Sequence, residues 1–134
     1  MGGHAMRLLK ILLVLFVCAA SPAVAGPFED GHAAYVRGDY ATALRLWRPL
    51  AEQGNPGAQY NLGGMYASSR GVSQGVPHDL VQAYKWFSLA ASRAPASQKD
   101  LRELAIKGRN LVAPHMTPAE IAEAQKLARE WKPR

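Results

Sequence analysis

The sequence is poor in the residues that most often build reactive sites. It has a single cysteine, Cys18, among 134 residues, and aromatic residues make up 8% of the chain. Cys18 lies in an apolar run near the N-terminus and follows Val17, where lipid attachment would need a small residue. If that run is removed, no thiol remains. Disulfides, cysteine nucleophiles and zinc–thiolate sites are then excluded.

The chain also lacks an uninterrupted apolar run long enough to cross a bilayer. The run from Leu8 to Ala20 spans 13 residues, whereas a spanning helix needs about 20. Arg7 and Lys10 provide a basic start, and an Ala-x-Ala site ends at Ala25. This pattern predicts a secretory signal peptide over residues 1–25, removed to leave a periplasmic or secreted domain over residues 26–134. An uncleaved membrane anchor is the alternative, and the natural start is either Met1 or Met6.

No dense run of basic residues and no stripe of mixed aromatic and basic residues is present. The formal net charge of +6 falls to +4 when Arg7 and Lys10 are removed, and the remaining basic residues are scattered. Proteins that bind nucleic acids usually gather such residues into a patch or stripe. We therefore expect no nucleic-acid partner and no stable membrane insertion of the mature domain.

Sustained alternation of apolar and polar residues is missing too, so no sheet is predicted. Asp39, Asn55, Asp79 and Thr117 are expected N-caps, with capping boxes at Asp79 and Thr117. Proline in the second helix, at position 49, predicts a kink or an early end there. The expected helices cover residues 28–37, 39 to the Gly54-Asn55-Pro56 break, 56–69, 79–93, 96–112 and 117–131. Their apolar stripes include Trp47, Trp86, Trp131, Leu101, Leu104, Ala105, Leu111 and Val112, which we expect in the core.

The helix that begins at Asp39 and the one that begins at Asp79 are copies of each other. Ala43, Leu46-Trp47 and Leu50-Ala51 align with Ala83, Trp86-Phe87 and Ala90-Ala91 at a constant offset of 40 residues. An internal repeat of this length is typical of helical solenoids, in which stacked pairs bury the apolar faces that single pairs leave exposed. The predicted fold is an all-α solenoid of about three antiparallel helix pairs.

These residues resemble a known family. The pattern Ala58, Leu62-Gly63, Tyr66, Gly71-Val72, Asp79, Ala83, Trp86 and Ala90-Ala91 is similar to the Sel1-like repeat, a relative of the tetratricopeptide repeat. The resemblance covers most of residues 28–133 and includes a C-terminal capping helix at about 117–131. One departure is a loop lengthened by what looks like a tandem duplication over residues 71–78.

The resemblance implies a scaffold, because similar proteins act as adaptors in bacterial envelope assembly, secretion, signalling or host contact. A cysteine-rich branch is linked to β-lactam binding, but the cysteine-free mature chain does not support that activity. In the tetratricopeptide architecture ligands lie on the concave face, lined by the first helix of each pair. By position, the implied partner-binding residues are His32, Tyr35, Tyr60, Gly64, Ala67 and Ser68. The nearby Arg37 is added because arginine, like tyrosine, is favoured at binding hot spots. Phe28 also maps there, and Phe28 and Tyr35 are equally well explained as core.

Two functions are compared. The first is a non-catalytic scaffold in the cell envelope that binds an unidentified protein or peptide. The second is a module that binds or hydrolyses cell-wall material, namely peptidoglycan or β-lactams. The second requires a nucleophile or a perturbed acid, and the sequence has no nucleophile elbow, Ser-x-x-Lys pattern or metal-ligand spacing. We expect no enzyme activity, cofactor or metal. A structural spacer without a ligand is a third possibility.

Overall fold

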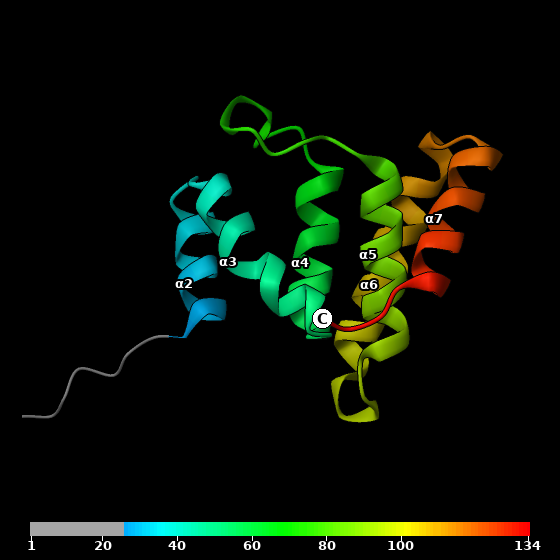
Figure 1. Ribbon diagram of the computed structural model, residues 1–134, viewed down its shortest axis with the longest axis horizontal. Helices are drawn as coiled ribbons and strands as arrows, with labels where there is room; N and C mark the ends of the chain where they lie inside the picture. The colour runs from blue at the N-terminus through cyan, green and yellow to red at the C-terminus, as the bar shows by residue number, and fades with distance from the viewer. Residues whose placement is uncertain (1–25) are drawn as a thin grey trace, which may run out of the picture.

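Residues 26–134 are described by a computed structural model, and within them the chain contains helices and no strand. The predicted signal peptide, residues 1–25, lies outside the described residues. None of the described helices is both long and apolar enough to cross a membrane. The α-helices follow one another from left to right in Figure 1, with α6 behind α5. They are α2 (Pro27–Val36), α3 (Tyr40–Glu52), α4 (Pro56–Ala67), α5 (Leu80–Arg93), α6 (Lys99–Val112) and α7 (Pro118–Glu130).

Local capping fixes where most helices begin, as predicted. Asp39, Asn55, Asp79 and Thr117 are the N-caps of α3, α4, α5 and α7, and each side chain accepts a hydrogen bond from a backbone N–H of the first turn. Such caps satisfy donors that the helix itself leaves unpaired. Within residues 26–134 a complete capping box is found at Thr117. At Asp79 the side chain accepts the hydrogen bond from the backbone N–H of Gln82, but the return bond from the Gln82 side chain is not made.

The structure decides against an early end of α3 and shifts the start of one other helix. Helix α3 continues through Pro49 to Glu52, so the proline does not end it early. Tertiary packing compensates for the lost donor, because Trp47 and Ala51 on either side of the proline are buried. The fifth helix begins as a 3-10 turn over residues 96–98 and becomes α-helical at Lys99.

The helices pack largely in chain order, which confirms the helical repeat. Helix α2 packs on α3, α4 packs on both α3 and α5, and α6 packs on α5 and over a shorter stretch on α4. Helix α7 also packs on α5, whereas α6 and α7 make little direct backbone contact with each other. The third pair therefore straddles α5 instead of forming a closed hairpin like the first two.

Glycines let aromatic side chains fill the contacts between helices. A Cβ on Gly63 of α4 would lie 2.6 Å from the ring of Phe87, and a Cβ on Gly108 of α6 would lie 2.8 Å from the same ring. Trp47 packs in the same way against Gly31 of α2. Both aromatic residues are buried, and burying one such side chain contributes about 1.5–3 kcal/mol. Trp47 and Phe87 are the equivalent residues that the 40-residue offset predicted.

The apolar stripe predicted for α6 is only partly buried. Ala105 and Val112 are in the core, but Leu104 and Leu111 are 48% and 64% exposed. The prediction that these two leucines are core residues is wrong. Helix α6 contacts α4 and α5 on one side only, so the edge of the stripe that carries the leucines stays uncovered. Trp131 is half-buried at the end of α7, 6.5 Å from the ring of Trp86.

The lengthened loop between α4 and α5 is hydrogen-bonded to the first helix pair. Gln74 in this loop accepts hydrogen bonds from the backbone N–H groups of Tyr40 (2.8 Å) and Ala41 (3.2 Å) and donates to the carbonyl of Gly38 (2.8 Å). Val76 in the duplicated part of the loop is buried. The loop thus caps α3 from the neighbouring repeat.

The residues after α7 fold back along the helices. The backbone N–H of Arg134 donates to the carbonyl of Glu52 at the end of α3, at 2.8 Å. The guanidinium of Arg93 lies 4.9 Å from the centre of the Trp131 ring and donates to the carbonyl of Gly54. The tail therefore joins the third helix pair to the first, and Figure 1 shows it running past α5 toward the lower end of α4.

Candidate functional site

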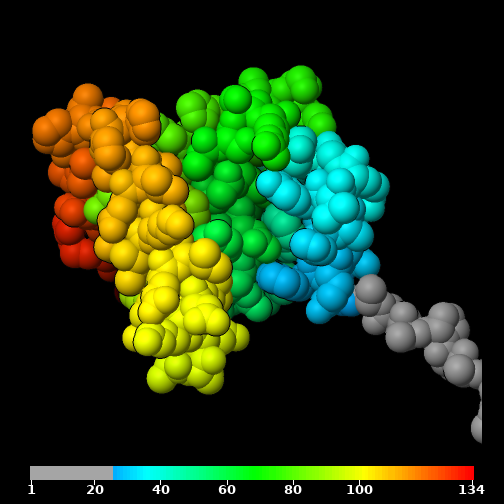
Figure 2. Space-filling model, turned by 180° about the vertical axis from the view of Figure 1, so that it is seen from behind, coloured from blue at the N-terminus to red at the C-terminus, as the bar shows by residue number. Residues whose placement is uncertain are grey.

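Helices α2, α4 and α6, the first of each pair, line one side of the molecule. Figure 2 shows this side, where the green surface of α4 is set back between α2 in blue and α6 in yellow and orange. We call it the hollow face and define it by the side chains that line it: His32, Tyr35, Tyr60, Asn61, Gly64, Leu104, Lys107 and Leu111. It corresponds to the concave face that the resemblance predicted.

A cavity of about 250 Å³ lies in the hollow face between α2 and α4. Four of the predicted partner-binding residues line it together, namely His32 and Tyr35 from α2 and Tyr60 and Gly64 from α4. The remaining lining residues are Trp47, Asn61 and Met65. Trp47 and Met65 are buried, so the cavity has an apolar floor and an aromatic wall.

The aromatic wall is held in place by ring contacts. Tyr35 packs edge-on against Tyr40 at 5.3 Å between ring centres and against Trp47 at 5.9 Å. Tyr60 packs against Phe87 at 5.7 Å. The indole N–H of Trp47 donates to the backbone carbonyl of Phe28 at 3.0 Å, which fixes the orientation of the indole. These contacts position the rings before any ligand arrives, and this lowers the entropy cost of binding.

Gly64 keeps the middle of the hollow face open. It is exposed, and a Cβ at this position would meet nothing within 4 Å. Its neighbour Gly63, about 100° further around α4, is on a packed side of the helix against Phe87. Of the two adjacent glycines, one therefore permits helix packing and the other leaves room at the surface.

The other predicted residues lie elsewhere. Arg37 forms an exposed ion pair with Asp39 at 3.5 Å. It does not line the cavity, because two residues along a helix turn a side chain about 200° away from Tyr35. Ser68 lines a separate hollow of about 10 Å³ that also includes Tyr35 and Tyr40. Ala67 is half-buried at the end of α4 and lines neither space.

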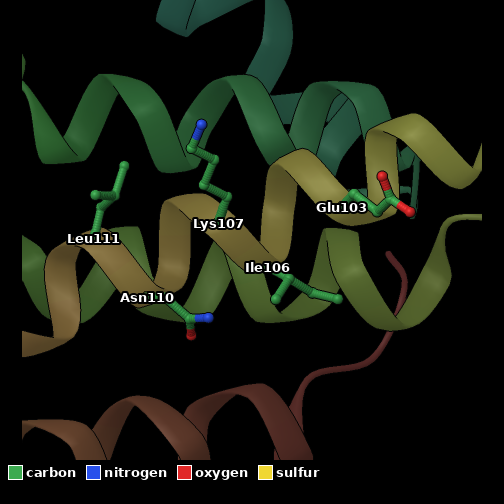
Figure 3. Close-up of a pocket in the computed structure, with 5 residues that line it drawn as sticks. All are labelled: Glu103, Ile106, Lys107, Asn110 and Leu111. Carbon is green, nitrogen blue, oxygen red and sulfur yellow. The ribbon is translucent and has the colours of Figure 1, made fainter.

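Helix α6 contributes residues to the hollow face that sequence reasoning missed. A shallow depression of about 350 Å³ runs along this helix and is lined by Glu103, Ile106, Lys107, Asn110 and Leu111. Figure 3 shows Lys107 and Leu111 on the side of α6 that faces α4, and Ile106 and Asn110 on the opposite side. Leu104 and Leu111 are seven residues apart, so they share a face. That spacing was visible in the sequence but was interpreted as core.

The groups with shifted pKa values lie outside the cavity. Hydrogen bonds from Thr42 lower the pKa of Asp39, and the backbone hydrogen bond with Thr117 lowers the pKa of Glu120. Burial lowers the pKa of Lys85, whose ammonium group lies 4.2 Å from the centre of the Trp86 ring. Within residues 26–134 no group of three or more His, Cys, Asp or Glu side chains could hold a metal ion. The cavity offers aromatic and apolar contacts with a few polar groups, which is the chemistry of a binding surface.

The protein-family comparison divides the chain at the same place as the first two helix pairs. The model of the Sel1 repeat matches residues 26–55 and again residues 56–94, together about half of the chain. The first match contains α2 and α3, and the second contains α4, the long loop and α5. A search of curated proteins and a search of solved structures each found no match. Sel1 repeats are generally protein–protein interaction modules and are typically non-catalytic. The two matched repeats and their helix pairing show that this chain belongs to the Sel1 repeat family.

Proposed function

We propose that this protein is a non-catalytic scaffold that binds a protein or peptide on its hollow face. The single observation that carries the proposal is the convergence of exposed aromatic and apolar side chains there. Tyr35 is 36% exposed beside the cavity between α2 and α4, and Leu104 and Leu111 are exposed across from it on α6. Exposed apolar groups gathered on one concave surface mark interaction sites more often than scattered ones do.

The composition of the hollow face favours a ligand segment with apolar side chains. Tyrosine and tryptophan rings supply large contact areas at low entropy cost and dominate binding hot spots. Trp47 gives the cavity a rigid floor and Asn61 can orient a polar backbone there, while Lys107 in the depression along α6 can bind an acidic group. Such a surface suits a peptide segment that places an aromatic or aliphatic anchor in the cavity.

The proposed location is the periplasm or the space outside the cell. This part of the proposal rests on the sequence pattern of residues 1–25, which is typical of a signal peptide. Cell fractionation with N-terminal sequencing of the accumulated protein tests it. A mature N-terminus at Gly26 in the envelope or medium supports the proposal, whereas full-length protein in the cytoplasm contradicts it.

The binding proposal is tested by crosslinking in living cells, followed by affinity capture with three variants. Gly64→Gln fills the middle of the hollow face and improves helix propensity, so it should abolish capture without weakening the fold. Ala33→Gln adds the same side chain at an exposed position of α2 that lines no cavity described above, and should leave capture unchanged. Tyr60→Ala should weaken capture while circular dichroism shows the native helical content.

Three results would contradict the proposed function. One is equal capture of the same partner by the Gly64→Gln and Ala33→Gln proteins. Another is loss of folding in both Tyr60→Ala and Tyr35→Ala, which would assign these rings to the core. The third is release of cell-wall fragments or hydrolysis of a chromogenic β-lactam by the pure protein, which would establish the enzymatic alternative.

A further inference from the structure

The third helix pair leaves a groove lined in part by polar side chains. Because α6 and α7 both pack on α5 and barely touch each other, a space of about 400 Å³ remains between them. Ser88 and Ser92 of α5 lie along its floor, Arg109 of α6 forms one wall, and Arg129 and Gln125 of α7 form the other. We call this space the α5–α7 groove. It is separate from the hollow face.

The two arginines of the groove have no acidic partner in residues 26–134. The ion pairs in this part of the chain are Arg37–Asp39 and Lys99–Glu103, and neither includes Arg109 or Arg129. The three glutamates of α7, at positions 120, 123 and 130, lie on the other side of that helix by the 100° step between successive residues. The groove therefore presents two positive charges that nothing in the described chain neutralises.

Hydroxyl and amide groups line the groove beside the arginines, together with Leu89 and Ala128. The amide of Gln125 donates to the hydroxyl of Tyr84 at 3.4 Å, so the hydroxyl proton of Tyr84 is free to point into the groove. Ser92 donates to the carbonyl of Leu89, and the hydroxyl of Ser88 makes no hydrogen bond within residues 26–134. Guanidinium groups with nearby hydroxyls form the donor set that suits carboxylates, because arginine can grip both carboxylate oxygens at once.

We propose that the α5–α7 groove binds carboxylate groups of an acidic peptide segment, independently of the hollow face. Charge complementarity identifies the occupant. The lining residues of α5 run from Tyr84 to Ser92, so the space extends along much of that helix, and Leu89 beside them offers an apolar contact for the aliphatic part of an acidic side chain. A nucleic acid is less well matched, because single strands need exposed rings for base stacking and Tyr84 is buried.

The test is titration of the purified, ¹⁵N-labelled protein with a tetraglutamate peptide that has blocked ends, followed by NMR. The expected result is a set of shifts at the backbone amides of Ser88, Ser92, Arg109 and Arg129, which weakens as salt is added. Blocked tetraglutamine should cause no such shifts. Replacing either arginine by glutamine should weaken binding about tenfold, since hydrogen bonds to charged groups contribute this much.

Matched variants separate a built site from general attraction to a basic protein. Arg45→Gln removes an exposed arginine of α3 and should leave the affinity unchanged. Ser88→Glu introduces a carboxylate into the groove, keeps both arginines and should abolish the shifts. Gly64→Gln should not change them, which keeps this result distinguishable from failure of the proposed function.

Three outcomes would overturn the proposal. They are equal binding of tetraglutamine, equal loss of affinity in Arg45→Gln and in Arg109→Gln, and tighter binding of a single-stranded oligonucleotide than of tetraglutamate.

Discussion

Adding one methyl group at either of two adjacent glycines should change stability in opposite directions. Both Gly63 and Gly64 lie within α4, so replacing either with alanine gains about 1 kcal/mol of helix propensity. At Gly64 the new Cβ meets nothing within 4 Å, and the whole gain should be retained. We therefore expect the free energy of unfolding to rise by about 1 kcal/mol in Gly64→Ala.

At Gly63 the same methyl group collides with a ring that cannot move away. The Cβ would lie 2.6 Å, 2.7 Å and 2.9 Å from three ring atoms of Phe87. Gly108 of α6 also lies against that ring, and Tyr60 packs against it as well. Overpacking of a core costs about 1–3 kcal/mol, and the loss of the close approach between α4 and α5 adds to this. Gly63→Ala should therefore lose about 1–2 kcal/mol after the propensity gain.

Urea unfolding followed by circular dichroism measures both variants against the unmodified protein. Each kcal/mol lost lowers the melting temperature of a domain of about 100 residues by roughly 4–8 °C. A Gly63→Ala protein as stable as Gly64→Ala would refute the argument, because the two sites differ in what the methyl group meets and in little else. A Phe87→Leu change made together with Gly63→Ala should recover part of the loss.

Two further predictions concern the ends of helices. Gln74→Ala should lower the free energy of unfolding by about 1 kcal/mol, which is typical for the loss of a helix cap. Ser73→Ala in the same exposed loop should not lower it. Equal melting temperatures of the two variants would contradict the cap that Gln74 provides to α3. Asp39 and Glu120 have pKa values lowered below those of the unfolded chain, so the unfolded state binds more protons and stability falls as pH drops through the folded values. Asp39→Asn with Glu120→Gln keeps hydrogen-bonding groups at both caps and should flatten the decline below about pH 4. If the stability of this double variant declines at low pH as steeply as that of the unmodified protein, other carboxylates cause the decline.

The sequence predicted the features that depend on near neighbours. The caps at Asp39, Asn55 and Thr117 involve residues three positions apart, and the local pattern is enough to identify them. The 40-residue offset identified Trp47 and Phe87 as equivalent, because each copy of the repeat packs an aromatic ring of its second helix against a glycine of its first. Four of the seven predicted site residues line one cavity for the same reason, since their spacing along α2 and α4 is regular.

What sequence reasoning missed depends on distant parts of the chain. An apolar stripe shows which side of α6 faces the core. How much of that stripe is buried depends on how far α4 and α5 extend over it, and they leave Leu104 and Leu111 exposed. The contact from Gln74 to Tyr40 joins residues 34 positions apart, and no local sequence pattern predicts it. Arg37 is of a type favoured at hot spots and follows Tyr35 closely, but residues two positions apart lie on different sides of a helix.

The backbone bond from Arg134 to Glu52 affects how this molecule comes apart. In a row of repeats each pair contacts only its neighbours, so an end pair can open alone while the middle stays closed. Here α7 cannot detach without its tail leaving α3, and the long loop holds the first pair to the second in addition. Opening at one end is thereby coupled to opening at the other. The helices from α3 to α7 form a closed circuit of contacts, with α2 packed outside it on α3, and amide exchange in α3 and α7 should slow or quicken together.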